Sequence, residues 1–494
     1  MSKSKILGML VVLAFVAWPA SAAVASTAVL VQPAAGPPGT KVVLTGSGFG
    51  RASSVLLSVR GLRAVRAGAN RGGRFQTTIT VPAGAARSVK ITARARGRRV
   101  IAYFTVSTAA GATESSEAAT ARGALVRWSP HAGVAGSRLV LRGSRLARRA
   151  LHRIAFDAGG GHSVRTGRHG GLKATVAVPQ IPAGPHSFRL TGRGTSLRLP
   201  FTVLPDPVVA GAGDIACGAN SGSAQCKQMM TSDLLLQIAP TAVLALGDTQ
   251  YENGEYDNFL RFYDPSWGRL KAITYPAVGN HEYGTSQASG CGYACGYFDY
   301  WDGPGQMNGR AGARNAGYYA FDVGAWRLYA VNSNCGRTGA PGCGPGSAQL
   351  RWLEADLAAH PRACSLMFMH HPLFTSDTRN FDSPQFRDTL RPMWQAFYDH
   401  GGDVVLTGHS HFYERYAPQD PQEHPDPAHG IRQFIVGTGG RNVYGVGQVE
   451  PTSEVRGVST FGVIRLGLHA SSYDWRFVQE PGKPFTDSGS QACH

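Results

Sequence analysis

The sequence predicts an α/β layered domain preceded by two all-β modules. Three observations lead to this prediction. Before residue 205, short runs of alternating apolar residues are separated by Gly and Pro turns. Part of this pattern occurs twice. After residue 205, apolar runs that end in turn residues alternate with amphipathic helical patterns, which is typical of layered α/β domains. A chain of 494 residues is also too long for one ordinary core.

Residues 1–25 have the three parts of a secretory signal peptide. Lys3 and Lys5 precede the apolar run Ile6–Trp18, and small residues at 20–25 offer cleavage sites. The apolar run is too short to cross a bilayer, and no later segment is long and apolar enough. We therefore expect a protein without a membrane span that is secreted, extracellular or associated with the cell envelope.

An internal repeat divides the first part of the chain into residues 26–106 and 125–204. Pro38–Phe49 aligns with Ala135–Leu146, and the "FTV" at Phe104–Val106 aligns with that at Phe201–Val203, both at an offset of 97 residues. Each copy is predicted to be a β-sandwich. The opening "PGTKVVLTGSGF" resembles the immunoglobulin-like modules of the transcription-factor type. By composition, residues 107–124 are a flexible linker.

The net charge of +18 is unevenly distributed along the chain. Residues 1–205 hold 29 Lys and Arg against 3 Asp and Glu, whereas the remainder holds 20 against 28. One interpretation is that the basic modules bind an anionic cell-wall or surface polymer. The other is a solvated β surface in a chain whose cations are mostly arginine. The scattered charges favour the second interpretation.

All eight cysteines follow residue 205, and their even number in an exported chain predicts disulfide bonds. A thiolate zinc site is the alternative, but there is no CxxC pair and the spacings are irregular. Sequence does not fix the connectivity. Because short loops close at low entropic cost, we expect Cys217–Cys226, Cys291–Cys295 and Cys335–Cys343, with Cys364–Cys493 as the remaining pair.

Residues 206–494 form the predicted α/β domain. Strand-like apolar runs are separated by helical patterns such as Ser347–His360, whose leucines at 350, 353 and 357 share one face. Five of the runs end at a residue that can bind metal. In chain order, these ends are Asp214, Asp248, Asn280, His370 and the pair His409 and His411. Because sites in α/β domains lie at strand ends, we expect these side chains to converge.

The five strand ends carry the motifs GD, GDxxY, GNHE, HxP and GHxH. This order resembles the calcineurin-like metallophosphoesterases, and the GDxxY variant resembles the purple acid phosphatases. The resemblance covers 206–494 and implies a β-sandwich flanked by helices. It also implies two metal ions that share one carboxylate. The first ion would be held by Asp214, Asp248, Tyr251 and His411, and the second by Asp248, Asn280, His370 and His409.

The first motif lacks a histidine that many members of the superfamily have, because Ala216 stands at that position. The phenolate of Tyr251 replaces the missing imidazole in the ligand set that the resemblance implies. A phenolate favours a hard trivalent ion, so we expect Fe(III) there and a divalent Fe, Zn or Mn ion beside it.

Three further residues are candidates for substrate contacts. His281 matches the family residue that contacts phosphate and can protonate the leaving group. In "MHHP", the HxP pattern selects His370 as the ligand, and His371 either faces the substrate or has a structural role. Arg379 either binds phosphate or is a solvated loop cation.

The leading hypothesis is a secreted dinuclear phosphatase in which metal-bound hydroxide attacks a phosphomonoester and His281 assists the leaving group. A phosphodiesterase or nucleotidase with the same site is the first alternative. A wall-binding protein with a vestigial catalytic domain is the second, and retention of all seven matched ligands argues against it.

Overall fold

The computed structural model describes residues 28–32, 35–36, 41–47, 49–50, 52–59, 64–70, 73–80, 88–95, 98–106, 119–121, 124–157, 159–218, 226–287, 292–378 and 384–494. The predicted signal peptide, Cys291 and Arg379 lie outside these residues. The chain divides into two compact units, Met1–Ser115 and Ser116–His494.

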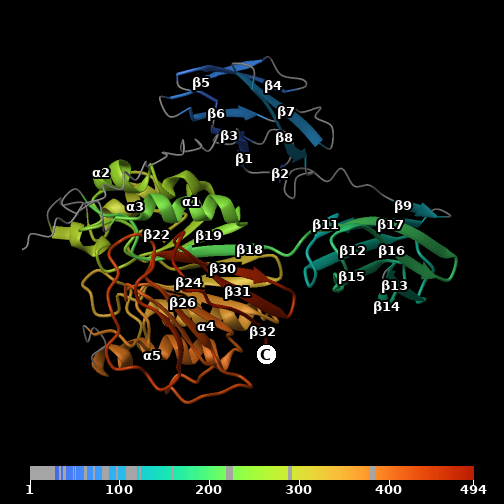
Figure 1. Ribbon diagram of the computed structural model, residues 1–494. Coiled ribbons are helices and arrows are strands. Elements are labelled where there is room, and N and C mark those ends of the chain that lie inside the picture. Colours follow the sequence, from blue (N-terminus) through green and yellow to red (C-terminus); the bar gives the residue numbers. More distant parts are fainter. Residues whose placement is uncertain are drawn as a thin grey trace, which may run out of the picture. The chain divides into compact units, whose positions relative to one another are not determined.

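The first unit contains a three-stranded sheet in the order β1–β3–β6 and a five-stranded sheet in the order β2–β8–β7–β4–β5 (Figure 1). Apolar side chains from both sheets, such as Leu44 and Leu57, form one core. The strands are β1 (Ala28–Gln32), β2 (Ala35–Gly36), β3 (Lys41–Ser47), β4 (Ser54–Val59), β5 (Val65–Gly68), β6 (Phe75–Thr80), β7 (Ser88–Ala95) and β8 (Arg98–Val106).

The second unit opens with a module built in the same way. Its sheets have the orders β15–β12–β10–β9 and β11–β17–β16–β13–β14. Five of its strands begin 97 residues after their counterparts, which confirms the repeat: β11 (Ala132–Gly133), β12 (Arg138–Ser144), β13 (Leu151–Phe156), β15 (Leu172–Ala177) and β17 (Thr195–Val203). The others are β9 (Ala119–Ala121), β10 (Ala124–Ser129), β14 (Gly159–Arg165) and β16 (Gly184–Gly192). β9 lies within the segment predicted as linker and pairs with β10.

Strict alternation explains why these segments are strands. Every second residue of β17 is buried and the residues between are exposed, as expected for a strand with one face on a core. The buried face belongs to a core that includes Leu141, Phe188 and Leu199. The described modules are therefore two-sheet β structures, as the sequence predicts.

After Pro205 the second unit continues as an α/β domain with two mixed sheets. One has the order β20–β19–β18–β30–β31–β32, and the other β23–β24–β25–β26–β28–β27–β29. The strands of the first sheet are β18 (Val208–Ala212), β19 (Ala242–Leu246), β20 (Thr274–Ala277), β30 (Gly462–Leu468), β31 (Ser472–Gln479) and β32 (Ser488–Ala492). Those of the second are β23 (Tyr319–Val323), β24 (Trp326–Ala330), β25 (Ser365–Phe368), β26 (Val404–Thr407), β27 (Tyr413–Tyr416), β28 (Arg432–Val436) and β29 (Ser453–Gly457). β21 (Asn308–Gly309) and β22 (Gly312–Ala313) form a small separate ribbon.

Helices cover the outer faces of both sheets (Figure 1). α1 (Gln228–Ile238), α2 (Tyr256–Asn258) and α3 (Cys295–Asp302) lie on the side of the first sheet, and α4 (Ala348–Ala359) and α5 (Pro384–Asp399) on the side of the second. The short helices η2 (Phe259–Tyr263), η3 (Trp267–Ile273) and η4 (Glu282–Gln287) complete the set. α4 coincides with the helix predicted at 347–360 and begins where Ser347 accepts a hydrogen bond from the Leu350 N–H.

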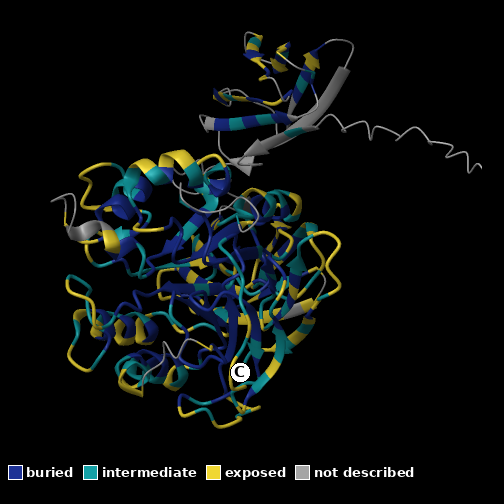
Figure 2. Cartoon of the chain, turned by 60° about the vertical axis from the view of Figure 1, so that its left-hand side comes forward, coloured by how far each residue is buried: buried dark blue, intermediate teal, exposed yellow. Residues whose placement is uncertain are grey.

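The two sheets enclose an apolar core, visible as the buried interior in Figure 2. β18, β19 and β20 are parallel, as are β24, β25, β26 and β28, so their carboxyl ends point toward one edge. The domain therefore has the layered architecture expected from sequence. Among the described residues, no helix is long and apolar enough to cross a membrane.

Candidate metal centre

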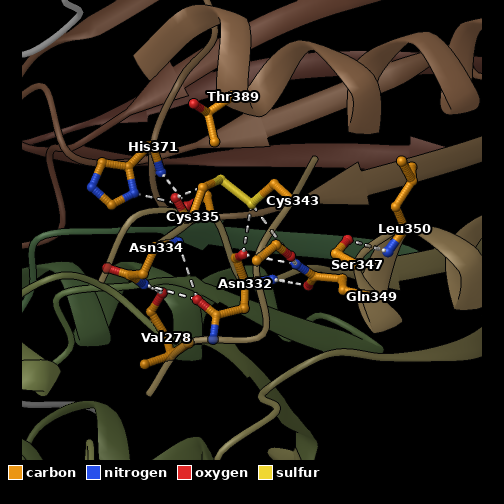
Figure 3. The surroundings of a disulfide bond; sticks show 12 residues. Val278, Asn332, Asn334, Cys335, Cys343, Ser347, Gln349, Leu350, His371 and Thr389 are labelled. Atoms are coloured by element: carbon orange, nitrogen blue, oxygen red, sulfur yellow. Dashed lines mark hydrogen bonds between the residues drawn. A yellow bond between two sulfur atoms is a disulfide. The ribbon is translucent and has the colours of Figure 1, made fainter. Parts of the chain in front are cut away.

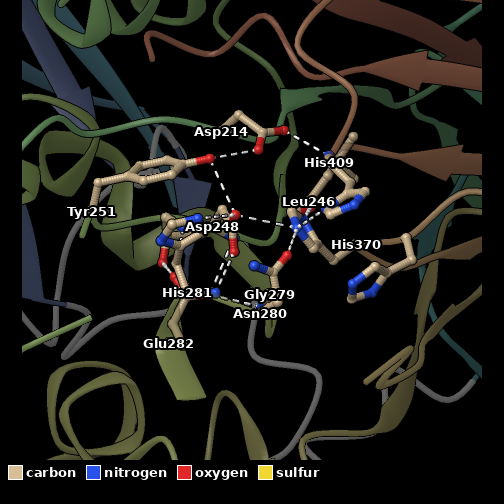
Figure 4. Close-up of polar contacts among 12 residues, drawn as sticks. Asp214, Leu246, Asp248, Tyr251, Gly279, Asn280, His281, Glu282, His370 and His409 are labelled. Carbon is tan, nitrogen blue, oxygen red and sulfur yellow. Dashed lines mark hydrogen bonds and ion pairs between the residues drawn. The ribbon is translucent and has the colours of Figure 1, made fainter. Parts of the chain in front are cut away.

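The predicted ligands lie just beyond the carboxyl ends of five parallel strands. Asp214 follows β18, Asp248 follows β19 and Asn280 follows β20, all from the first sheet. His370 follows β25, and the histidines of the GHxH motif follow β26, both from the second sheet. The structure thus brings together residues that are up to 197 positions apart in the sequence (Figure 4).

Four of the predicted ligands meet around the Tyr251 hydroxyl. This oxygen lies 2.7 Å from Asp214 Oδ1, 3.1 Å from Asp248 Oδ2 and 3.1 Å from His411 Nε2. His411 Nε2 is itself 3.1 Å from Asp214 Oδ1. This set is the one predicted for the first ion.

The other predicted ligands meet around His370 Nε2. This nitrogen lies 3.3 Å from Asp248 Oδ2, 3.0 Å from Asn280 Oδ1 and 3.1 Å from His409 Nδ1. Asp248 Oδ2 therefore faces both donor sets, the arrangement expected of a carboxylate shared by two ions. Carboxylate, amide and phenol oxygens with imidazole nitrogens form a donor set that suits Fe, Zn or Mn.

Backbone contacts orient these ligands. His370 Nδ1–H donates to the Leu246 carbonyl at 3.0 Å, and His411 Nδ1–H donates to the Asn442 carbonyl at 2.6 Å. Each contact leaves the Nε2 lone pair directed at the centre, as ligating histidines require. Each aspartate accepts a backbone N–H through its other oxygen: Asp214 Oδ2 from His409 at 2.7 Å, and Asp248 Oδ1 from His281 at 2.9 Å.

The pKa shifts of the buried acidic groups in the cluster favour the binding of a cation. Burial opposes ionisation of Asp248, but His370 and His281 outweigh it and hold the pKa of Asp248 well below its ordinary value. Burial, reinforced by the carboxylates of Asp214 and Asp248, raises the pKa of Tyr251 well above its usual range. Phenolate binding by Tyr251 therefore requires a positive charge in the centre, which a metal ion would supply.

Three of the candidate ligands have left-handed backbone conformations. φ is +59° at Asp214, +45° at Asp248 and +70° at His409, all unfavourable for residues other than glycine. The motif glycines make room for these turns. A Cβ at Gly279 would lie 2.1 Å from Asp248 Oδ1, and one at Gly408 would lie 2.7 Å from Asp214 Oδ2. Backbone strain of this kind concentrates at functional sites.

Glu282 organises the Asp248 loop, a role that sequence analysis did not assign. Its buried carboxylate accepts the N–H groups of Asp248 (3.1 Å), Thr249 (2.6 Å) and Gly279 (2.7 Å). The final residue of the GNHE motif was the available signal, since a glutamate that close to a ligand is either a ligand itself or supports one.

His281 lies at the open side of the centre. Its Nδ1–H donates to the Glu252 carbonyl at 2.5 Å, and its Nε2 lies 3.8 Å from Asp248 Oδ2. Its side chain is 34% exposed, whereas that of Asp248 is 2% exposed. This geometry is compatible with the predicted proton donation.

His371 also lies beside the second donor set, with its ring centroid 4.5 Å from that of His409. Ser333, another residue that sequence analysis missed, accepts the His371 backbone N–H at 2.8 Å and lies 2.9 Å from Nδ1. Burial and the neighbouring His409 lower the pKa of His371 well below its ordinary value, so its imidazole is neutral.

Among the residues that the structure describes, three disulfide bonds form: Cys217–Cys226, Cys335–Cys343 and Cys364–Cys493. They are three of the four pairs predicted; the fourth involves Cys291, which the structure does not describe. Cys335 lies two residues after Ser333, and Figure 3 shows the Cys335–Cys343 bond and His371 in one view. Arg379 is likewise outside the described residues.

Comparison with known proteins identifies the class of this domain. Residues 209–413 match the family model of the calcineurin-like phosphoesterases. The chain is 26% identical over 258 residues to purple acid phosphatase 23 of Arabidopsis thaliana, covering 44% of this chain and 51% of that protein. It is 28% identical over 196 residues to an uncharacterized protein of Mycobacterium tuberculosis, covering 37% of this chain and 36% of that protein. The chain thus spans about half or less of these relatives.

Solved structures of low identity also match. A purple acid phosphatase from yellow lupin seeds covers 94% of this chain and 95% of its own, with 15% identity and a TM-score of 0.46. The structure of PhoD covers 74% of this chain and 88% of its own, with 12% identity and a TM-score of 0.40. The match to the family model shows a calcineurin-like phosphoesterase domain at residues 209–413, and purple acid phosphatase 23 is a homologue of part of the chain. The family predicted from the five motifs is confirmed.

Proposed function

We propose that the protein is a metal-dependent phosphoric ester hydrolase whose substrates are phosphomonoesters. The observation that carries the proposal is Asp248 Oδ2, which lies 3.1 Å from Tyr251 OH and 3.3 Å from His370 Nε2. One carboxylate oxygen between two donor sets suits two cations that share it. The calcineurin-like phosphoesterase domain supports the same class of reaction.

The proposed cofactors are Fe(III) and a divalent Fe, Zn or Mn ion. Asp214, Asp248, Tyr251 and His411 would hold the ferric ion, because a phenolate favours a hard trivalent cation. Asp248, Asn280, His370 and His409 would hold the divalent ion. When bound, the two ions would lower the pKa of a water molecule and offset the charge of the phosphate group.

His281 is the proposed general acid. The Glu252 carbonyl holds its Nδ1–H, so a second proton on Nε2 can pass to the oxygen of the departing alcohol as the phosphorus–oxygen bond breaks. His371 is proposed to contact the phosphate through hydrogen bonding rather than charge, since its imidazole is neutral.

Secretion is also part of the proposal. Three disulfide bonds are typical of an oxidising compartment and support export of the chain. The two β modules are proposed to be immunoglobulin-like. Their basic residues suit an anionic polymer of the cell envelope, but the scatter of these charges favours a solvated surface.

Turnover of a chromogenic phosphomonoester and of the matching bis-ester, with and without a chelator, tests the function. We expect hydrolysis of the monoester that a chelator abolishes and added metal restores. Faster hydrolysis of the bis-ester would favour the phosphodiesterase alternative. No turnover of either ester by protein that contains both metals would favour a binding protein with a vestigial domain.

A further inference from the structure

Arg441 lies against the candidate centre, although no sequence motif drew attention to it. It follows the turn after β28, and its backbone N–H donates to the Asp214 carbonyl at 2.8 Å. Its guanidinium carbon lies 5.0 Å from the centroid of the Tyr251 ring. Its side chain is only 19% exposed, so much of the charge is shielded from water.

The side chain of Arg441 also reaches the residue after Tyr251. Its Nη2 lies 2.7 Å from Glu252 Oε1, while the Glu252 carbonyl accepts the His281 Nδ1–H. The His281 ring in turn packs on Tyr251, with the ring centroids 4.4 Å apart. Arg441 therefore contacts both Tyr251 and Glu252, and His281 contacts the same two residues beside the centre.

We propose that Arg441 is a positioning residue for Tyr251. Its guanidinium holds the phenol ring in the centre and stabilises the negative charge of the phenolate when a ferric ion is bound. This inference rests on the proposed function, in which Tyr251 binds Fe(III). A guanidinium is always charged and attracts the face of an aromatic ring. A phenolate ring is more electron-rich than a phenol ring, so a phenolate attracts the guanidinium more strongly than a phenol does.

The Glu252 carboxylate acts in the opposite direction, because it is a negative charge close to the same ring. Its side chain is 47% exposed, so water screens it more than it screens the guanidinium. The combined electrostatic effect of Arg441 and Glu252 on the phenolate is therefore that of a positive charge. Removing Arg441 and removing Glu252 should shift the energy of the phenolate donor level in opposite directions.

The visible absorption of the iron-loaded protein reports this effect directly. Light absorption moves charge from the phenolate to Fe(III), so a cation near the phenolate lowers the donor level and raises the transition energy. We expect R441Q to shift the absorption maximum to longer wavelength by about 10 nm or more, the size that loss of a cation–π contact would produce. R441K, which keeps the charge, should shift it less, and E252Q should shift it to shorter wavelength.

R261Q is the matched control, because the Arg261 guanidinium lies 5.2 Å from the ring of Phe262, which is not a candidate ligand. Its spectrum should equal that of the wild type. An unchanged maximum in iron-loaded R441Q would overturn the inference while leaving the proposed function intact. If R441Q does not fold, E252Q decides, and a maximum that stays in place would overturn the inference. A colourless wild type with iron bound would overturn the inference together with the proposed binding of Fe(III) by Tyr251, and would leave the proposed hydrolase activity intact.

Discussion

Asp248 is the residue on which the candidate centre depends most, because one of its oxygens faces both donor sets. We expect Asp248→Asn to lose both metals and to reduce turnover more than 100-fold, since even the partner of a ligand is worth about 10–100-fold. Metal analysis and turnover of the chromogenic monoester measure the two effects. Asp257→Asn, at an exposed position, is the control. Loss of a single ion with activity retained would mean that Asp248 does not bridge.

Tyr251 determines whether the iron-loaded protein is coloured. A phenolate bound to Fe(III) absorbs visible light, and the Tyr251 hydroxyl is 2.7 Å from Asp214 Oδ1, within the first donor set. We expect the iron-loaded protein to be pink to violet and Tyr251→Phe to bleach it with the fold unchanged. Absorption and circular dichroism spectra measure both. An unchanged visible spectrum in the Phe variant would assign the colour elsewhere.

At the scale of elements, the loop after β19 depends on Glu282. Oε2 accepts the N–H groups of Asp248 and Gly279, and Oε1 accepts that of Thr249. Glu282→Gln would turn an amide NH2 toward backbone donors, so we expect metal affinity to fall about 10–100-fold. Titration against a competing chelator measures this. Wild-type affinity in a folded variant would show that the loop holds its shape without the carboxylate.

Asp403, at the start of β26, makes stability depend on pH. It is buried beside His494, and it accepts the Ser365 N–H at 2.8 Å. Burial raises its pKa to about 7, well above the ordinary carboxyl value. Between about pH 4 and 7 the folded state therefore holds a proton that the unfolded state has released, so the contribution of Asp403 to stability falls as pH rises.

We expect wild-type protein to lose up to about 4 kcal/mol of this contribution between pH 4 and 8, at about 1.4 kcal/mol per pKa unit. In Asp403→Asn, the free energy of unfolding should lack this part of its pH dependence. Urea unfolding of both proteins at pH 5 and pH 8 measures the difference. Equal pH dependence in the two proteins would mean that Asp403 is ionised in the folded state at pH 5.

At the scale of the whole molecule, the β modules should be dispensable for the chemistry. No candidate ligand lies in residues 26–204. Chains beginning at Ser116 and at Asp206 should keep most of the turnover on a small soluble ester. Binding to an anionic polymer at low and high salt would test the modules themselves. A large loss of turnover in either shortened chain would refute the modular organisation.

Several parts of this architecture can be predicted from sequence because their causes are local. The 97-residue repeat, the helix at 347–360 and the apolar runs before each ligand follow from periodicity, since a buried strand or helix face leaves its mark on neighbouring residues. The glycines in GD, GN and GH can be seen in the sequence, but their cause is tertiary, because a side chain there would meet residues from other strand ends.

The sequence by itself determined the types and order of the candidate ligands. Asp214, Asp248, Asn280, His370 and His409 each follow a strand of their own, with Tyr251 and His411 a few residues further along the chain. Only the tertiary structure decided which groups support them. Glu282 acts on Asp248 across 34 residues, Ser333 on His371 across 38, and Arg441 on Glu252 across 189. The GNHE motif marks Glu282 but not its partners, and no local pattern marks Ser333 or Arg441, because these contacts arise where two sheets bring their strand ends to one edge. The same packing decided that His370 faces Asp248 and that His371 lies beside Ser333.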